Sequence, residues 1–141
     1  GRISAFQETS DGRYLLNLTG VSRFRIVSEL ASVRGYRRFH VDFSDFKTDL
    51  APPFVSPSLG AAPVRDALRA YAAEKGLELD WKTVESLDVV SLVNALSQTL
   101  PFDVAEKQSL LEAGSIDARA GLLTGLLGGG SDAPATPTTL H

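Results

Sequence analysis

The sequence predicts an α+β protein in which antiparallel strands come first and a bundle of helices follows. Apolar and polar residues alternate through the first third of the chain, which is the period of a half-buried strand. Beyond a proline-rich stretch the apolar residues recur every three or four positions, which is the period of a helix. The charge changes at the same place: residues 1–50 carry eight basic and six acidic side chains, and residues 51–141 carry six and eleven. We therefore expect two architectural units in this chain of 141 residues.

These patterns divide the chain into four segments. We expect a β-subdomain over residues 1–47, a proline-rich packed connector over 48–62, a helical bundle over 63–127 and a disordered tail over 128–141. The tail is rich in Gly, Ser, Ala, Pro and Thr, which are poor material for an apolar core. Residue 1 is glycine and the sequence contains no methionine, so we expect a chain that was processed or cut from something longer.

The β-subdomain should contain four strands, over residues 2–9, 14–19, 21–27 and 36–43. Asp11-Gly12 between the first two is a hairpin signal, because glycine supplies the positive φ that such a turn needs. Gly20 interrupts the second run, and Gly35 precedes the fourth. Each strand should have one apolar face, because its side chains alternate between the two faces of the sheet.

The connector combines prolines with large apolar residues. Four prolines in or beside it exclude a long helix or a central strand: Pro52, Pro53, Pro57 and Pro63. Phe54, Val55 and Leu59 are too apolar for a free linker, so we expect this segment to pack across a surface.

The helices of the second half are marked mainly by their ends. Pro63 suits a first helical position, and Gly76 suits the end of the same helix. Later helices should begin after the N-cap residues Asp80, Asp88, Asp103 and Ser115. Asp103 and Glu106 have the spacing of a capping box.

Composition excludes several kinds of chemistry. The chain has no cysteine, so it has no disulfide, no thiolate nucleophile and no cysteine-ligated metal. Its two histidines, His40 and His141, are too few for a multi-histidine metal site. No phosphate-binding G-x-x-x-x-G-K-[ST] run and no apolar run long enough to span a membrane occur. We therefore predict no catalytic residue, no cofactor and no metal.

Two groups of residues could suggest a catalytic base or a cation site, but the surrounding sequence does not favour either function. His40 lies on the polar face of a strand without a G-x-S-x-G elbow, and a solvated strand histidine explains it. Asp42, Asp45 and Asp49 lack the loop of a calcium site and are typical of a polar strand exit.

Basic and aromatic residues are interleaved around Arg23-Phe24-Arg25 and residues 36–40, a mixture found in RNA-binding sheets. Strand alternation places Phe24 on the face opposite Arg25 and Phe39 on the face opposite Arg38, which favours a core role for these aromatic rings. Trp81, the single tryptophan, is either a core anchor of the helical half or part of a binding surface.

The order of these features resembles a known family, the N-terminal substrate-recognition domain of ATP-dependent Lon proteases, and especially its small stand-alone bacterial form. The resemblance starts at the Asp-Gly hairpin and continues with a G-x-x-R-F-x-I pattern at Gly20, Arg23, Phe24 and Ile26. The helical part of the family is matched by residues 92–97, 100–102, 105–108 and 110–112. The resemblance covers residues 1 to about 127.

The resemblance implies a β-barrel related to the PUA fold, followed by a helical bundle. It also implies that the family's first strands precede Gly1, so that the barrel is partial here and residues 1–47 present an open sheet edge and an uncovered apolar face. In the full proteases this domain gathers unfolded or tagged substrates for an ATPase and a peptidase, neither of which fits in this chain. The implied setting is protein quality control in a bacterial cytoplasm.

The leading functional hypothesis is a non-catalytic module that binds unfolded or extended polypeptide segments. Its candidate binding residues are Phe54, Val55, Leu59, Tyr71 and Trp81. A protease or chaperone is the implied partner, self-association through the open sheet edge is a further one, and no membrane is involved. An RNA-binding module is the alternative, since PUA-related barrels often bind RNA. A hydrolase acting through His40 is the third hypothesis.

Overall fold

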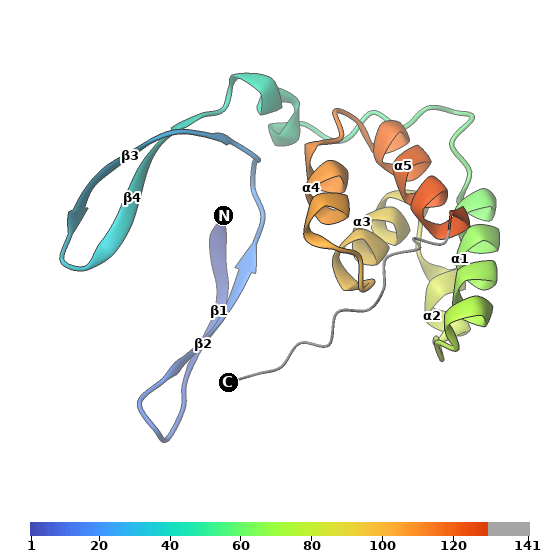
Figure 1. Cartoon of the computed structure of the whole chain (residues 1–141), viewed down its shortest axis with the longest axis horizontal. Helices are drawn as coiled ribbons and strands as arrows, with labels where there is room; N and C mark the ends of the chain where they lie inside the picture. Colours follow the sequence, from blue (N-terminus) through green and yellow to red (C-terminus); the bar gives the residue numbers. More distant parts are fainter. Residues whose placement is uncertain (130–141) are drawn as a thin grey trace. The chain divides into compact units, whose positions relative to one another are not determined.

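The computed structural model of the chain describes residues 1–129 and consists of two units (Figure 1). The first unit is Gly1–Pro53 and contains the strands, and the second begins at Phe54 and contains the α-helices. The predicted order, strands followed by helices, is confirmed, and so is the α+β class. The predicted disordered tail lies outside the described residues from position 130 onward.

The first hairpin joins β1 (Arg2–Glu8) to β2 (Tyr14–Thr19) in antiparallel register. The predicted turn forms at Asp11-Gly12, where Gly12 adopts φ +78°. A bulge between Ile3 and Ala5 shifts the register near the open end of the hairpin. Because a bulge changes the alternation by one residue, it brings Ile3 onto the same face as Phe6.

The second hairpin joins β3 (Arg25–Val33) to β4 (Tyr36–Asp42). Its two-residue turn is Arg34-Gly35, and both residues have positive φ (53° and 82°), as type I′ turns require. The predicted third strand, residues 21–27, was therefore placed too early. The turn pairs residues 25–33 with β4, while the backbone N–H of Arg23 donates to the Asp49 carboxylate instead of to a strand (2.8 Å).

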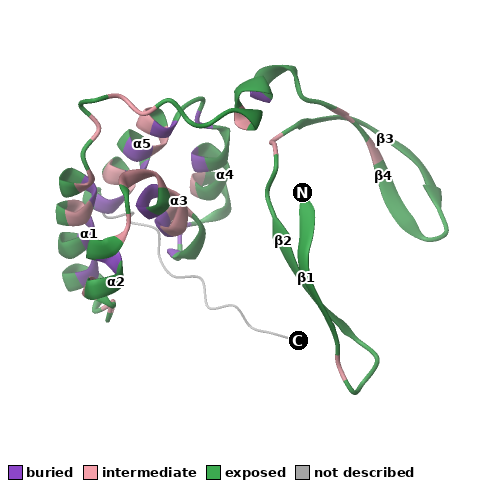
Figure 2. Ribbon diagram, turned by 180° about the vertical axis from the view of Figure 1, so that it is seen from behind, coloured by how far each residue is buried: buried purple, intermediate pink, exposed green. Residues whose placement is uncertain are grey.

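The two hairpins form separate two-stranded sheets, and the described residues do not close into a barrel. After β4 the chain enters a short 3₁₀ segment, η1 (Ser44–Leu50), which supplies Phe46, the one buried residue among the described side chains of this unit. The strands themselves are exposed almost throughout (Figure 2).

The described part of the second unit contains five helices: α1 (Ala61–Lys75), α2 (Trp81–Ser86), α3 (Val89–Thr99), α4 (Val104–Glu112) and α5 (Ile116–Gly128). The predicted N-caps are confirmed at Asp80, Asp88, Asp103 and Ser115, and the capping box between Asp103 and Glu106 is complete. Gly76 ends α1 with φ +65°. That helix begins two residues before Pro63, which lies in the first turn, where the missing N–H of proline costs no helix bond.

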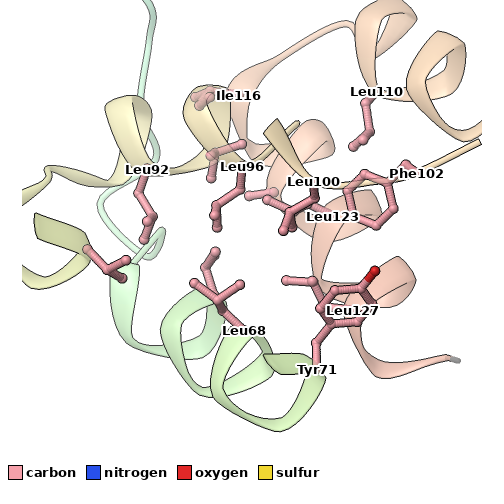
Figure 3. Packing of buried hydrophobic residues seen from close by; sticks show 14 residues of the cluster. Leu68, Tyr71, Leu92, Leu96, Leu100, Phe102, Leu110, Ile116, Leu123 and Leu127 are labelled. Carbon is pink, nitrogen blue, oxygen red and sulfur yellow. The ribbon is translucent and has the colours of Figure 1, made fainter. Parts of the chain in front are cut away.

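The core of the protein lies in the helical unit, where apolar side chains from all five helices meet (Figure 3). Its largest fully buried members come from α1, α3, α4 and α5: Leu68, Leu92, Leu110, Leu123 and Leu127. Burying a leucine contributes roughly 2 kcal/mol, so this cluster is the main source of stability of the chain. No helix among the described residues is long and apolar enough to cross a membrane.

Candidate functional site

The five predicted binding residues divide into accessible and buried ones. Phe54 is 81% exposed, whereas Val55 and Leu59 are half-buried against the helical core. Tyr71 is buried, with its ring centroid 6.3 Å from that of Phe102 (Figure 3). Trp81 is half-buried at the start of α2. Four of the five therefore pack in or on one core.

Trp81 and Tyr71 differ in what they offer to a ligand. The guanidinium of Arg69 lies 5.4 Å from the centroid of the Trp81 ring, in a cation–π arrangement. The Trp81 ring is thus held at the surface between core and solvent, while Tyr71 supports the core from within. None of the five residues lines either of two surface hollows that the structure shows elsewhere.

One of these hollows, which we call the apolar hollow, lies in the β unit. It has a volume of about 360 Å³ and is lined by Val21, Ser22, Phe43, Phe46, Lys47 and Leu50. Val21, Phe43 and Leu50 are exposed, and Phe46 forms the buried part of the wall. Ligand sites occupy roughly 300–1,000 Å³, so this hollow is large enough for one or a few apolar side chains.

An arginine–aspartate pair organises the wall of the apolar hollow. Arg23 donates from Nε to Asp49 Oδ2 (2.8 Å) and from Nη2 to Asp49 Oδ1 (2.7 Å). The Arg23 guanidinium also lies 4.7 Å from the centroid of the Phe46 ring. Both charged side chains are about five-sixths buried (17% and 16% exposed), and donation to Asp49 raises the pKa of Arg23. A bidentate pair of this kind holds η1 beside the start of β3.

A second apolar surface, the hairpin face, is formed by β1 and β2. Ile3 lies opposite Leu18, and Phe6 lies opposite Leu16. The Tyr14 ring stacks on Phe6 with centroids 5.2 Å apart. These five side chains are 48–70% exposed, so a contiguous apolar face meets solvent in the described structure.

The residues considered for a catalytic or metal site form local hydrogen bonds and ion pairs or are exposed to solvent. Asp42 accepts hydrogen bonds from the Ser44 hydroxyl and backbone N–H, which lower its pKa. Asp45 pairs with Arg25, and Asp49 pairs with Arg23. No group of three or more potential metal ligands occurs among residues 1–129. His40 is exposed on β4.

Comparison with known families identifies the domain. The fold consists of a strand unit with exposed apolar surfaces and a helical bundle with its own core. The family model for the substrate-binding domain of ATP-dependent protease La (LON) matches residues 1–128. The chain therefore belongs to this family, and its role is that of a substrate-binding module. Neither a curated protein nor a solved structure matches the chain.

The apolar hollow was missed in the sequence because its lining comes from segments that are distant in the chain. One signal was available. Arg23 and Arg25 share one face of an extended segment, and Asp45 and Asp49 are four residues apart in a short segment. Matched spacings of opposite charges of this kind are compatible with two pairs, which the structure shows.

Proposed function

We propose that this substrate-binding domain holds unfolded or extended polypeptide segments and performs no reaction on them. The observation that carries the proposal is the apolar hollow, and the exposed hairpin face is a further apolar surface of the same unit. An unfolded segment differs from a folded protein in displaying large apolar side chains, and the hollow offers such a side chain a partly buried wall at Phe46.

The strands of the β unit add a way to hold the backbone of a bound segment. β1 pairs only with β2, and β3 pairs only with β4, among the described residues. Each hairpin strand thus has an outer edge that faces no other strand there. An extended segment added at such an edge would make main-chain hydrogen bonds, which depend little on sequence. This suits a domain that receives many different substrates.

The predicted residues of the helical unit stay candidates for contact with a bound segment. Phe54 and Trp81 are the two whose rings reach solvent, and Val55 and Leu59 support the segment that presents Phe54. We place Tyr71 in a supporting role, because its ring is buried. A protease or chaperone that takes over the bound segment is the partner we propose for such a module.

The test uses fluorescently labelled casein, an unfolded protein, titrated with the full chain and followed by anisotropy. We expect saturable binding with a dissociation constant below about 1 mM. Leu50→Asp should weaken it at least tenfold, because it puts a carboxylate on the apolar hollow. Leu50 is 73% exposed, so the fold should tolerate the change.

Val104→Asp is the matched control, since Val104 is 86% exposed, lies at the start of α4 and lines neither hollow. Equal binding by both variants would eliminate the apolar hollow as the site. A change in Trp81 emission on binding, lost in Phe54→Ala, would instead locate the segment on the helical unit. No saturable binding at all would overturn the proposed function.

The structure favours neither the RNA-binding nor the hydrolase hypothesis. Three of the four arginines in the basic and aromatic runs, Arg23, Arg25 and Arg37, each pair with a carboxylate. Their charge is therefore largely balanced locally. Both hypotheses stay predictions, to be checked by filter binding of structured RNA at low salt and by assay of a His40→Ala variant.

A further inference from the structure

A second surface hollow lies in the helical unit, between α4 and α5. This α4–α5 groove has a volume of about 460 Å³ and is lined mainly by Ala105, Ser109, Gly121, Leu122, Gly125 and Leu126. Leu122 is 44% exposed and Leu126 is half-buried, so the rim is apolar as well. The groove belongs to a different unit from the apolar hollow.

Two glycines in the groove are not explained by the fold. Gly121 and Gly125 lie inside α5, where each costs about 1 kcal/mol relative to alanine. Neither is among the glycines with positive φ in residues 1–129. A Cβ atom built on either would meet no neighbouring atom within 4 Å. Neither backbone conformation nor packing within the described chain therefore requires glycine, and both residues leave the α5 backbone open to close approach by something else.

The conformation of the occupant follows from the backbone of the groove. Its walls are two α-helices, whose interior N–H and C=O groups are already paired with each other. An extended segment buried there would find no main-chain partners and would leave its own N–H and C=O groups unpaired. A helix satisfies its backbone internally and needs only to bury an apolar stripe.

The charges of the two helices that form the groove indicate which side chains should flank that apolar stripe. Glu106 lines the groove, and α4 and α5 with their caps carry three further carboxylates, Asp103, Glu112 and Asp117. The same segment has two basic residues, Lys107 and Arg119. Arg119 donates to Asn94 Oδ1 (2.6 Å) and to the Leu110 carbonyl (2.8 Å). The segment over residues 103–129, which forms the groove, therefore carries a net negative charge, with Glu106 at the groove itself, and this favours basic side chains on the partner.

We propose that the α4–α5 groove docks an amphipathic α-helix of a partner protein, with an apolar stripe flanked by lysine or arginine. The domain then has two kinds of binding surface. Unfolded or extended segments would bind on the β unit, and a folded helical element would bind on the helical unit. The second surface is argued from the helical unit alone and does not rest on the proposed function.

The probe is a labelled Leu/Lys peptide of about 18 residues with apolar positions at helical spacing, long enough to be helical when bound. It is titrated into the full chain and followed by anisotropy. A Leu/Glu peptide with the same stripe and a scrambled Leu/Lys peptide serve as references. We expect the Leu/Lys peptide to bind at least tenfold more tightly than either.

Gly121→Leu is the decisive variant, because a Cβ at this position meets no atom within 4 Å and the longer leucine side chain would occupy the groove. It should weaken peptide binding at least tenfold while leaving the melting temperature unchanged or higher. Gly128→Leu is the matched control, since Gly128 lies in the same helix and does not line the groove. If Gly121→Leu does not fold, Leu122→Lys provides a second variant with the same expected loss.

Several outcomes would overturn the proposal. Unchanged binding by Gly121→Leu and Leu122→Lys would show that the peptide binds elsewhere. Equal affinity for the scrambled peptide would show that the groove does not recognise an apolar stripe at helical spacing. Equal affinity for the Leu/Glu peptide would show that basic side chains on the partner are not preferred. A dimer of the native chain that Gly121→Leu dissociates would identify a second copy as the occupant. Competition between unfolded casein and the Leu/Lys peptide would identify an extended segment as the occupant of the groove. If a variant that no longer binds the Leu/Lys peptide still binds casein, the α4–α5 groove and the casein site are separate surfaces.

Discussion

At the scale of single residues, Arg23 shows how one side chain positions a functional surface. Its guanidinium binds both oxygens of Asp49 and covers the ring of Phe46. Lysine would not replace it, because a single ammonium group cannot make two parallel hydrogen bonds to a carboxylate. The shape of the apolar hollow therefore depends on the Arg23–Asp49 pair, although neither residue of the pair lines the hollow.

Removing the carboxylate should destabilise the β unit. We expect Asp49→Ala to cost about 2 kcal/mol locally, because it leaves a mostly buried guanidinium without its charged partner. Hydrogen exchange of the η1 and β3 amides measures this local stability. Asp45→Ala is the control: Asp45 pairs with Arg25 while both side chains are more than half exposed, and such pairs contribute little. Equal effects of the two variants would contradict the role given to Asp49.

Glycine conformation gives a second prediction at this scale. Gly76 ends α1 in the left-handed region, where a Cβ costs about 1–2 kcal/mol. Gly76→Ala should therefore lower the free energy of unfolding of the helical unit by roughly that amount. Gly121→Ala is the matched control and should raise it by up to about 1 kcal/mol, since Gly121 lies inside a helix. Chemical denaturation followed by far-UV circular dichroism compares the two.

At the scale of elements, the helix starts were predictable and the third strand was not. An N-cap is a local event, since Asp88 needs only the N–H groups of Val90 and Ser91 next to it in the chain. The position of β3 depends on its partner strand and on the Arg34-Gly35 turn, so the apolar alternation from residue 21 onward was misleading. Sequence patterns therefore predict helix starts, which depend on neighbouring residues, better than strand positions, which depend on a partner strand.

The aspartate caps make the helices sensitive to acid. Hydrogen bonds from the Ser91 hydroxyl and then the backbone lower the pKa of Asp88, and Thr83 does the same for Asp80. A pKa that is lower in the folded state means that folding favours the ionised form, so this stabilisation is present above the unfolded pKa near 3.9 and is lost as the pH falls through the folded pKa.

We therefore expect the melting temperature of the helical unit to fall as the pH drops below about 4. Asp88→Asn should reduce this dependence, because asparagine caps a helix without titrating. Glu74→Gln, a substitution of an exposed residue within α1, is the control and should leave the acid dependence unchanged. Thermal melts at a series of pH values provide the measurement, and identical pH profiles for Asp88→Asn and the native chain would contradict the assignment.

At the scale of the whole molecule, the class and the order of units followed from patterning and turn signals, but the surfaces did not. Exposed Phe54, in the proline-rich connector, and buried Tyr71, in a predicted helix, were both candidates because both are large aromatic residues. Burial separates them only after the helices pack. The apolar hollow similarly requires residues 21–22 to meet residues 43–50, a contact that no local pattern specifies.

The distribution of the core gives the last prediction. Among residues 1–129, sixteen of the seventeen buried apolar residues belong to the helical unit, and Phe46 alone belongs to the β unit. Isolated two-stranded hairpins are at best marginally stable in water, because they bury too little apolar surface to offset the entropy of ordering the chain. The two units should therefore differ sharply when they are produced separately.

A fragment of residues 54–129 should show helical circular dichroism and a cooperative thermal transition, since all fourteen residues of the core cluster lie within it. A fragment of residues 1–53 should lack dispersed amide resonances or should associate through its exposed apolar faces. Leu92→Ala in the longer fragment should lower its free energy of unfolding by about 2–5 kcal/mol. A loss of this size would confirm that this core is the source of the transition. A folded, monomeric 1–53 fragment would contradict the argument, because it would mean that the described hairpins are stable without a partner for their apolar faces.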